Sequence, residues 1–542
     1  MDSTMDVGGL LRYAEHPSLE DRRDALLSRR VSLLAELAEV YQGLNAIVPI
    51  HQLPAELVVE IMAYLVVDGY KEVARPWRSL MEVCHRWRVI ICSTSLFWRR
   101  VSVGCNSRWL TLCLERCGNA PVHISFYEPA FPHHLLPLIL ANHASTVRSL
   151  AFFKVDWQWE TSLNALFSLH MPALEGVAVN NTSVDRLCTG LRLSGSHLPR
   201  LTSVSLSDFV VPEDLALCKK LKQIELRNAP LPMGLRKFFS TMQSKTCLQE
   251  ISFSDSFKEV PAMMQFPVPT SPPLELPHIR KFHLQSGARP VIQQILYALR
   301  APNATDISIT GIVRGQQDVP GNHLFVPRLL PGPRHPHDLI PSLATATSVV
   351  LKFEGHGPVV LEASNSKQRI HLAVIDDSNW LLDYRSLLHI CLCDVISLFS
   401  TAPVASIAVY SEYEYTARSD VWRLLFASFP QLETLTLTGL SAYADMWDGL
   451  MEASTTSTTP EMSCHGLKTI ELDNVRFRST DNYDCVFRPI FGALRYRALK
   501  GCRLDTLRMR IKLEGPEDDL ALRRTYFPAL AVSVTNVVYY SY

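Results

Sequence analysis

Residues 201–206 read LTSVSL, and this order of residues, apolar-x-x-apolar-x-apolar, recurs along most of the chain. It returns at 174–179 (LEGVAV), at 221–226 (LKQIEL) and at 248–253 (LQEISF). Most intervals between the central apolar residues of the early copies are 27 residues long. We therefore predict short parallel strands, each followed by a return segment. The central residues of the first copies are Leu150, Val177, Val204, Ile224 and Ile251.

No copy of this length can bury its own apolar face, so neighbouring copies must stack to form a continuous core. The copies extend from about residue 120 to about residue 515, and the intervals widen to 42 and 58 residues beyond Ile307. Insertions or degenerate copies are therefore expected there. The spacing is that of leucine-rich repeats. We predict an irregular, curved α/β solenoid with parallel strands at 105–520 and a C-terminal segment at 521–542. The alternative is an ordinary α/β domain.

Length and composition set the broad class of the protein. The 542 residues exceed what one core usually supports, which agrees with several domains or a repeat array. The chain is 47% hydrophobic and holds 53 basic and 53 acidic residues, so its net charge gives no indication of nucleic acid or of an anionic membrane. It has no run of about 18 apolar residues and no secretory signal, and we expect a cytoplasmic and/or nuclear protein.

The sequence contains none of the common catalytic, nucleotide-binding or metal-binding motifs that we searched for. It contains no P-loop, G-x-G-x-x-G, H-E-x-x-H or G-x-S-x-G motif. His133 and His134, and the histidines at 335–338, have no further ligands at metal-site spacing. We therefore predict no catalytic residue, no metal and no cofactor.

The N-terminal part divides into two predicted segments. Residues 1–20 are expected to be disordered, and 21–48 show a heptad pattern. From Leu33 the apolar intervals alternate 4, 3, 4, 3, and Arg30 occupies the seam position before Leu33. The simpler interpretation is one amphipathic helix packed on the next domain, and the alternative is self-association. The apolar residues are Leu26, Leu33, Leu37, Val40, Leu44 and Ile47.

A compact helical segment is predicted at 49–104. Pro54 is suited to the first position of a helix, and Glu56 lies in the first turn, where a carboxylate interacts favourably with the helix dipole. Leu57, Ile61, Tyr64 and Leu65 recur on one helical face. The segment has more apolar residues than three short helices can bury, which predicts an exposed partner-binding patch.

The two stretches IHQLPAELVVEIMAYL (50–65) and LMEVCHRWRVIICSTSLFWRRV (80–101) resemble the F-box, especially in F-box proteins of mushroom-forming fungi. The family pattern is L-P-x-E followed by an apolar helix, then V-C-x-x-W and a closing tryptophan. The resemblance implies that the matching residues bind the adaptor. They are Leu53, Pro54, Glu56, Leu57, Ile61, Leu65, Val83, Cys84, Trp87 and Trp98.

The resemblance also implies a function. F-box proteins dock on a Skp-family adaptor, which joins them to the cullin of an SCF-type ubiquitin ligase, and the region after the F-box captures a target protein. Such a subunit is a non-catalytic receptor. The alternative is a repeat scaffold whose F-box no longer couples to a ligase.

The target is expected to bind the strand face opposite the core. Residues between the apolar positions point to that face and are small and weakly charged rather than basic, as at Ser203, Ser205, Gln223 and Glu225. A neutral protein surface therefore fits better than nucleic acid. The proline-rich stretches at 261–277 and 320–341 are the alternative site, as flexible lids.

Overall fold

The computed structural model describes residues 18–541 with several gaps, and it divides the chain into two compact units, Met1–Ser125 and Phe126–Tyr542. Among the described helices, none is long and apolar enough to cross a membrane. The gaps are 68–75, 182–189, 218, 232–234, 244–246, 256–271, 314–328, 331–336, 338–339, 355–356, 377–385, 413–414, 441–442, 456–462, 477–482 and 513–515.

The first unit is mainly helical. Its elements are α1 (Leu19–Ala46), the 3-10 turn η1 (Pro49–Gln52), α2 (Ala55–Val67), α3 (Pro76–Val83), α4 (His85–Ser93), the 3-10 turn η2 (Ser95–Trp98), β1 (Arg100–Val103), α5 (Ser107–Cys117) and β2 (Val122–Phe126), within which the division falls.

Helix α1 begins at a capping box. The Ser18 hydroxyl accepts a hydrogen bond from the Asp21 N–H (3.1 Å), and the Asp21 carboxylate accepts one from the Ser18 N–H (3.1 Å). No residue of α1 is buried. The expectation that this helix packs on the next domain is therefore wrong. Its main neighbour in the unit is η1, which follows directly and is too short to cover an apolar stripe.

The second unit is rich in strands. They are β3 (Val147–Val155), β4 (Gly176–Asn181), β5 (Ser203–Ser207), β6 (Gln223–Arg227), β7 (Glu250–Ser254), β8 (Leu274–Glu275), β9 (Lys281–Ser286), β10 (Leu299–Arg300), β11 (Asp306–Val313), β12 (Ser348–Phe353), β13 (Val359–Ser364), β14 (Arg369–Asp376), β15 (Ser406–Ser411), β16 (Thr434–Thr438), β17 (Thr469–Arg476), β18 (Leu504–Lys512) and β19 (Val534–Ser541).

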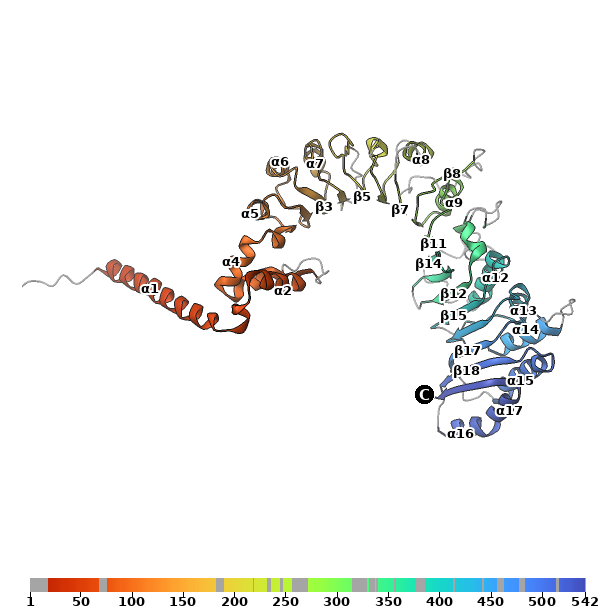
Figure 1. Cartoon of the computed structure of the whole chain (residues 1–542). Helices are drawn as coiled ribbons and strands as arrows, with labels where there is room; N and C mark the ends of the chain where they lie inside the picture. The colour runs from red at the N-terminus through yellow and green to blue at the C-terminus, as the bar shows by residue number, and fades with distance from the viewer. Residues whose placement is uncertain are drawn as a thin grey trace, which may run out of the picture. The chain divides into compact units, whose positions relative to one another are not determined.

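Helices follow many of these strands and lie along one face of the sheet (Figure 1). They are α6 (Leu136–Ala141), α7 (Trp159–Phe167), α8 (Leu235–Gln243), α9 (Arg289–Ala298), α12 (Leu387–Phe399), α13 (Ser419–Ser428), α14 (Tyr443–Thr455), α15 (Tyr483–Leu499), α16 (Pro516–Thr525) and α17 (Phe527–Ser533).

The strands are joined by one ladder of buried apolar residues. The five central residues predicted from the sequence are direct cross-strand partners in parallel pairs from β3 to β7. The same register position continues to β18, and each residue on it is at most 6% exposed. The ladder runs through Leu150, Val177, Val204, Ile224, Ile251, Phe282, Ile307, Ile370, Ala363, Val349, Ile407, Leu435, Ile470 and Leu507.

Strands β12, β13 and β14 lie in the sheet in reverse order. Strand β14 pairs with β11, whereas β12 pairs with β15, and β13 lies antiparallel between β12 and β14. The link from β13 to β14 is a tight turn in which the Asn365 carboxamide oxygen accepts the N–H groups of Lys367 and Gln368, both at 2.8 Å. Strands β13 and β14 lie between Val349 and Ile407 in the sequence, so they account for the 58-residue interval.

Just after several strands, one residue has a positive φ angle and so adopts the left-handed backbone conformation. Asp208 (φ 61°), Asn228 (φ 47°) and Asp255 (φ 51°) each come four residues after a ladder residue. Their N–H groups donate to the next strand, as from Asn228 to the Ser254 carbonyl (2.7 Å). Asn and Asp tolerate this conformation better than most residues, so their placement lets each strand end without losing its last inter-strand bond.

The predicted C-terminal segment at 521–542 contains β19, which pairs parallel with β18 and continues the sheet. Of the proline-rich stretches at 261–277 and 320–341, residues 261–271, 320–328, 331–336 and 338–339 lie outside the described residues. Where the first stretch is described, it forms β8, which pairs with β10.

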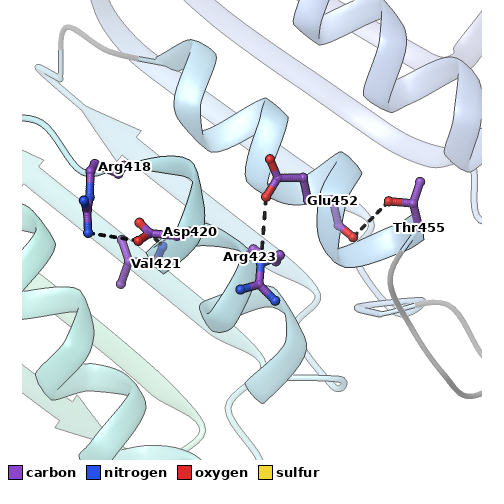
Figure 2. Close-up of polar contacts among 6 residues, drawn as sticks. All are labelled: Arg418, Asp420, Val421, Arg423, Glu452 and Thr455. Carbon is purple, nitrogen blue, oxygen red and sulfur yellow. Dashed lines mark hydrogen bonds and ion pairs between the residues drawn. The ribbon is translucent and has the colours of Figure 1, made fainter.

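Helices α13 and α14 approach each other closely at Gly449. A Cβ placed there would lie 2.5 Å from the Trp422 Cβ and 2.7 Å from the Ser419 carbonyl oxygen. Beside this contact, Arg423 and Glu452 form an ion pair between the helices (3.8 Å), which Figure 2 shows. Both side chains are over a third exposed, so the ion pair contributes little and the close packing dominates.

We predict that Gly449→Ala destabilises the second unit by about 1–3 kcal/mol, because the added methyl group has no room. Gly492→Ala on α15 is the matched control, since its Cβ would meet only the Met451 sulfur at 3.5 Å. The control should be neutral or stabilising by up to about 1 kcal/mol, because alanine favours helix. Urea unfolding of both variants measures the difference, and equal midpoints would contradict the packing argument.

Candidate functional site

Helix α2 has two apolar faces, and only one of them is covered. Val58 and Met62, four residues apart, are at most 2% exposed. On the other side, Leu57 and Ile61 are 46% and 41% exposed, and Tyr64 continues the same face. The apolar face predicted from the sequence is therefore the exposed one.

Another exposed apolar side chain lies at the end of α3. Val83 is exposed, although it belongs to a short helix that packs against both α2 and α4. The chain then turns through Cys84, whose sulfur accepts a hydrogen bond from the Trp87 N–H (3.4 Å) and caps α4. The core side of α4 is supplied by Ile90 and Ile91, which are buried.

Arg86 ties the start of α2 to the start of α4. Its guanidinium donates to the Leu53 carbonyl (2.7 Å) and also to the His51 carbonyl. The His51 ring stacks on Trp87 with 6.4 Å between centroids, and its Nε2 lies 3.8 Å from the Cys84 sulfur. The structure thus brings the predicted residues Leu53, Cys84 and Trp87 together.

Sequence reasoning missed Arg86. A positive charge in the first turn of a helix is unfavourable for the helix dipole, so an arginine at that position of α4 is a signal that it has a partner elsewhere. That partner is the pair of carbonyls that precede α2.

Trp98 does not belong to a partner surface, which corrects the prediction from the resemblance. It is 2% exposed, and its indole N–H donates to the Ile91 carbonyl (2.8 Å). Its ring lies 5.9 Å from that of Trp109, and the Arg116 guanidinium lies 5.0 Å from its centroid. A large ring enclosed in this way stabilises the unit and cannot contact an adaptor.

The other predicted residues of this segment fall into three groups. Pro54 and Glu56 are exposed at the start of α2, and Leu53 is half-buried beside them. The side chain of Leu65 lies outside the described residues.

The predicted target-binding residues on β5 and β6 lie side by side. Ser203 pairs in register with Gln223, and its hydroxyl donates to the Gln223 carboxamide oxygen (3.3 Å). Ser205 pairs with Glu225 and donates to its carboxylate (3.0 Å). These side chains therefore hydrogen-bond to one another across the two strands, and the surface they form is polar.

A pocket lies farther along the same kind of strand face, over β15 to β19, and sequence reasoning missed it. Its volume is about 820 Å³, and its walls come from five neighbouring strands. The Arg508 guanidinium lies 2.6 Å from the Glu471 carboxylate, and Arg510 lies 3.7 Å from that of Asp473. The sequence signal is a pair of arginines two residues apart on one strand. Lining residues are Tyr410, Thr436, Thr438, Glu471, Leu472, Asp473, Arg508, Arg510, Tyr540 and Ser541.

The middle of the sheet carries paired charges on its outward side chains. Burial raises the pKa of the Glu362 carboxyl, but the nearby Lys352 (3.0 Å), Arg369 (3.9 Å) and His371 (3.7 Å) together lower that pKa below its usual value. The strand face is therefore more charged here than the early strands indicate, with cations matched to anions. In the described part of the chain, no group of three or more His, Cys, Asp or Glu residues is placed to hold a metal ion.

Comparison with known proteins gives one match. Residues 50–103 match the F-box-like family. These residues run from η1 to the end of β1, so the exposed face of α2, the Arg86 tie and Trp98 all lie within the match. No curated protein sequence matches the chain significantly.

We predict that Trp98→Ala destabilises the first unit by about 3–5 kcal/mol, because it empties a buried aromatic site. Leu57→Ala should change its stability by about 1 kcal/mol or less, since that side chain is half in water. Hydrogen–deuterium exchange of α4 amides in the two variants provides the measurement. Faster exchange in both variants to the same extent would show that Leu57 also belongs to the core.

Proposed function

We propose that the chain is the substrate-recognition subunit of an SCF-type cullin–RING ubiquitin ligase. It docks on a Skp-family adaptor through the F-box-like segment, and through that adaptor it joins a cullin. The observation that carries the proposal is the exposed apolar face of α2, formed by Leu57 and Ile61 within the residues that match the F-box-like family.

The segment has separate sets of buried and exposed apolar residues, and this separation supports docking through the exposed set. Its core is already closed by residues such as Val58, Ile91 and Trp98, so the exposed Leu57, Ile61 and Val83 are not needed to hold the fold. Full burial of such a side chain contributes about 1.5–3 kcal/mol, and half-exposed ones contribute roughly half of that. Covering the three together supplies several kcal/mol for association.

The adaptor-binding surface in this proposal is smaller than the one the resemblance implies. Leu57, Ile61 and Val83 contact the adaptor, with Pro54 and Glu56 at the edge. Leu53, Cys84 and Trp87 position the start of α2 relative to α4 through the Arg86 tie.

The second unit, in our proposal, is an irregular leucine-rich-repeat-like solenoid that holds the target protein. The single buried ladder from β3 to β18 supports this, because each strand relies on its neighbours for burial. The β12–β14 hairpins are then an insertion that keeps the ladder continuous.

The target, we further propose, is a protein that binds over β15 to β19. Two exposed tyrosines, Tyr410 and Tyr540, stand at the two sides of the pocket, with Asp473 and Arg510 between them. Tyrosines around mixed charges suit a protein surface, since aromatic residues and arginine are enriched at interfaces. The cationic side chains lie beside carboxylates, which disfavours a phosphate backbone.

The receptor in this scheme does no covalent chemistry. It raises the effective concentration of target lysines near the ubiquitin-loaded enzyme. Its place of action is the cytoplasm, the nucleus or both, where the ligase complex works.

We predict that Leu57→Lys combined with Ile61→Lys weakens binding to a purified Skp-family adaptor at least about tenfold, because two ammonium groups would have to be desolvated at the interface. Titration calorimetry with the full chain provides the affinity. Leu138→Lys combined with Leu499→Lys is the control, since both leucines are exposed and lie in the second unit.

Undiminished affinity in the α2 variant would refute the assigned surface. If the unmodified chain fails to bind any Skp-family adaptor of its own organism, the alternative is supported, namely a scaffold whose F-box has lost coupling to a ligase.

We predict that Tyr410→Asp combined with Tyr540→Asp removes target proteins from the complex while the adaptor still co-purifies. Quantitative mass spectrometry of proteins bound to the tagged chain in its own cells measures both. Ser203→Arg combined with Ser205→Arg is the comparison on β5. If only the Ser203 and Ser205 variant loses the target proteins, the target-binding site lies on β5 and β6 instead.

A further inference from the structure

We propose that helix α1 pairs with α1 of a second copy of this chain to form an antiparallel two-helix coiled coil. The proposal is independent of the ligase function. It rests on the exposed apolar stripe of α1 and on a charge pattern that complements itself only when the two helices run in opposite directions.

The apolar stripe of α1 is long and uncovered. Leucine or valine recurs at every seventh position, and a second set of apolar residues follows directly beside it, so the stripe is about three positions wide in each heptad. All of these side chains are exposed, although they fill the length of a well-capped helix. A stripe of this extent marks an interface. The two sets are Leu19, Leu26, Leu33 and Val40, and Leu27, Leu34 and Tyr41.

Charge excludes a parallel pair. The remaining seam positions hold Arg23 and Arg30 in the first half of α1 and leucines in the second half. In a parallel coiled coil each seam residue faces its own copy, so both arginines would oppose arginines in the core. The flanking positions would give no compensation, because Arg29 would lie beside Leu34 and Glu36 beside Tyr41 of the second copy.

An antiparallel pair separates the arginines in the seam and also gives the flanking residues matching partners. When the twofold axis crosses between Val31 and Ser32, Arg30 faces Leu33 of the second copy and Leu37 faces Leu26. The arginine can then lay its aliphatic stem on the leucine while its guanidinium reaches water. No arginine faces an arginine in the seam.

The flanks of the antiparallel pair are also matched. On one side, Arg29 lies opposite Glu36 of the second copy, and symmetry produces this pair twice. On the other side, Leu27 lies opposite Leu34, again twice. All of these positions, and the outer layer of Leu19 against Leu44, fall within the bounds of α1 (Leu19–Ala46). A second copy therefore satisfies every charged and apolar position named here.

If the chain has the function proposed above, the consequence of this pairing is a bivalent receptor. Two F-box-like segments and two target-binding regions would be joined in one assembly, so a target with two binding sites would be held more tightly than by one copy.

The test uses the full-length chain without any adaptor. Sedimentation velocity over a range of concentrations should show a monomer–dimer equilibrium, and Leu33→Asp combined with Leu37→Asp should abolish the dimer. Leu138→Lys combined with Leu499→Lys should leave it intact. A chain that stays monomeric at all concentrations, or a dimer that persists in the Leu33 and Leu37 variant, would overturn the proposal.

The orientation is tested by charge exchange. Arg29→Glu alone and Glu36→Arg alone should each raise the dissociation constant of the dimer about tenfold, because two attractive pairs become repulsive. Mixing these two variants should restore dimerisation, since in the antiparallel mixed dimer each glutamate again faces an arginine. A mixture that dimerises no better than either variant alone would exclude the antiparallel arrangement.

Discussion

The second unit depends on one constraint: a single short strand cannot bury its own apolar side chains. Each ladder residue, such as Val204 or Ile251, is covered because the strands on both sides offer a residue at the same register position. A slip of one residue in any pair would turn the apolar set to the solvent face. The ladder therefore ties the strands into one cooperative structure, and departures from regularity are tolerated only where they preserve it.

The reversed order of β12, β13 and β14 is such a departure. The three strands enter as hairpins, yet Ile370, Ala363 and Val349 occupy the ladder position in turn. Because burial is satisfied from one side of the sheet, the other side is free to vary. Its outward residues change from serines that hydrogen-bond to the neighbouring strand on β5 to paired charges and tyrosines over β15–β19. Residues on this side can therefore vary without disturbing the core.

The first unit differs from the second, because it folds and still leaves apolar side chains of α2 in water. Helix α2 does both by burying Val58 and Met62 while leaving Leu57 and Ile61 in water. The Arg86 hydrogen bonds to the carbonyls before α2 hold its start in place. Helix α1 leaves still more apolar surface in water, because none of its described residues is buried.

The sequence by itself determined the parts that rest on local periodicity. The apolar spacing identified the strands and the ladder residues from Leu150 to Ile251, and the L-P-x-E and V-C-x-x-W stretches located the F-box-like segment. Only the tertiary structure decided which of these residues face a core. Trp98 is buried inside the first unit, and no residue of α1 is buried. In the sheet, the strand next to β11 is β14, although β12 is the next strand along the chain. The physical reason is that periodicity records which side of an element is apolar, whereas the neighbour that covers that side is set by long-range strand pairing and packing, which no local pattern encodes.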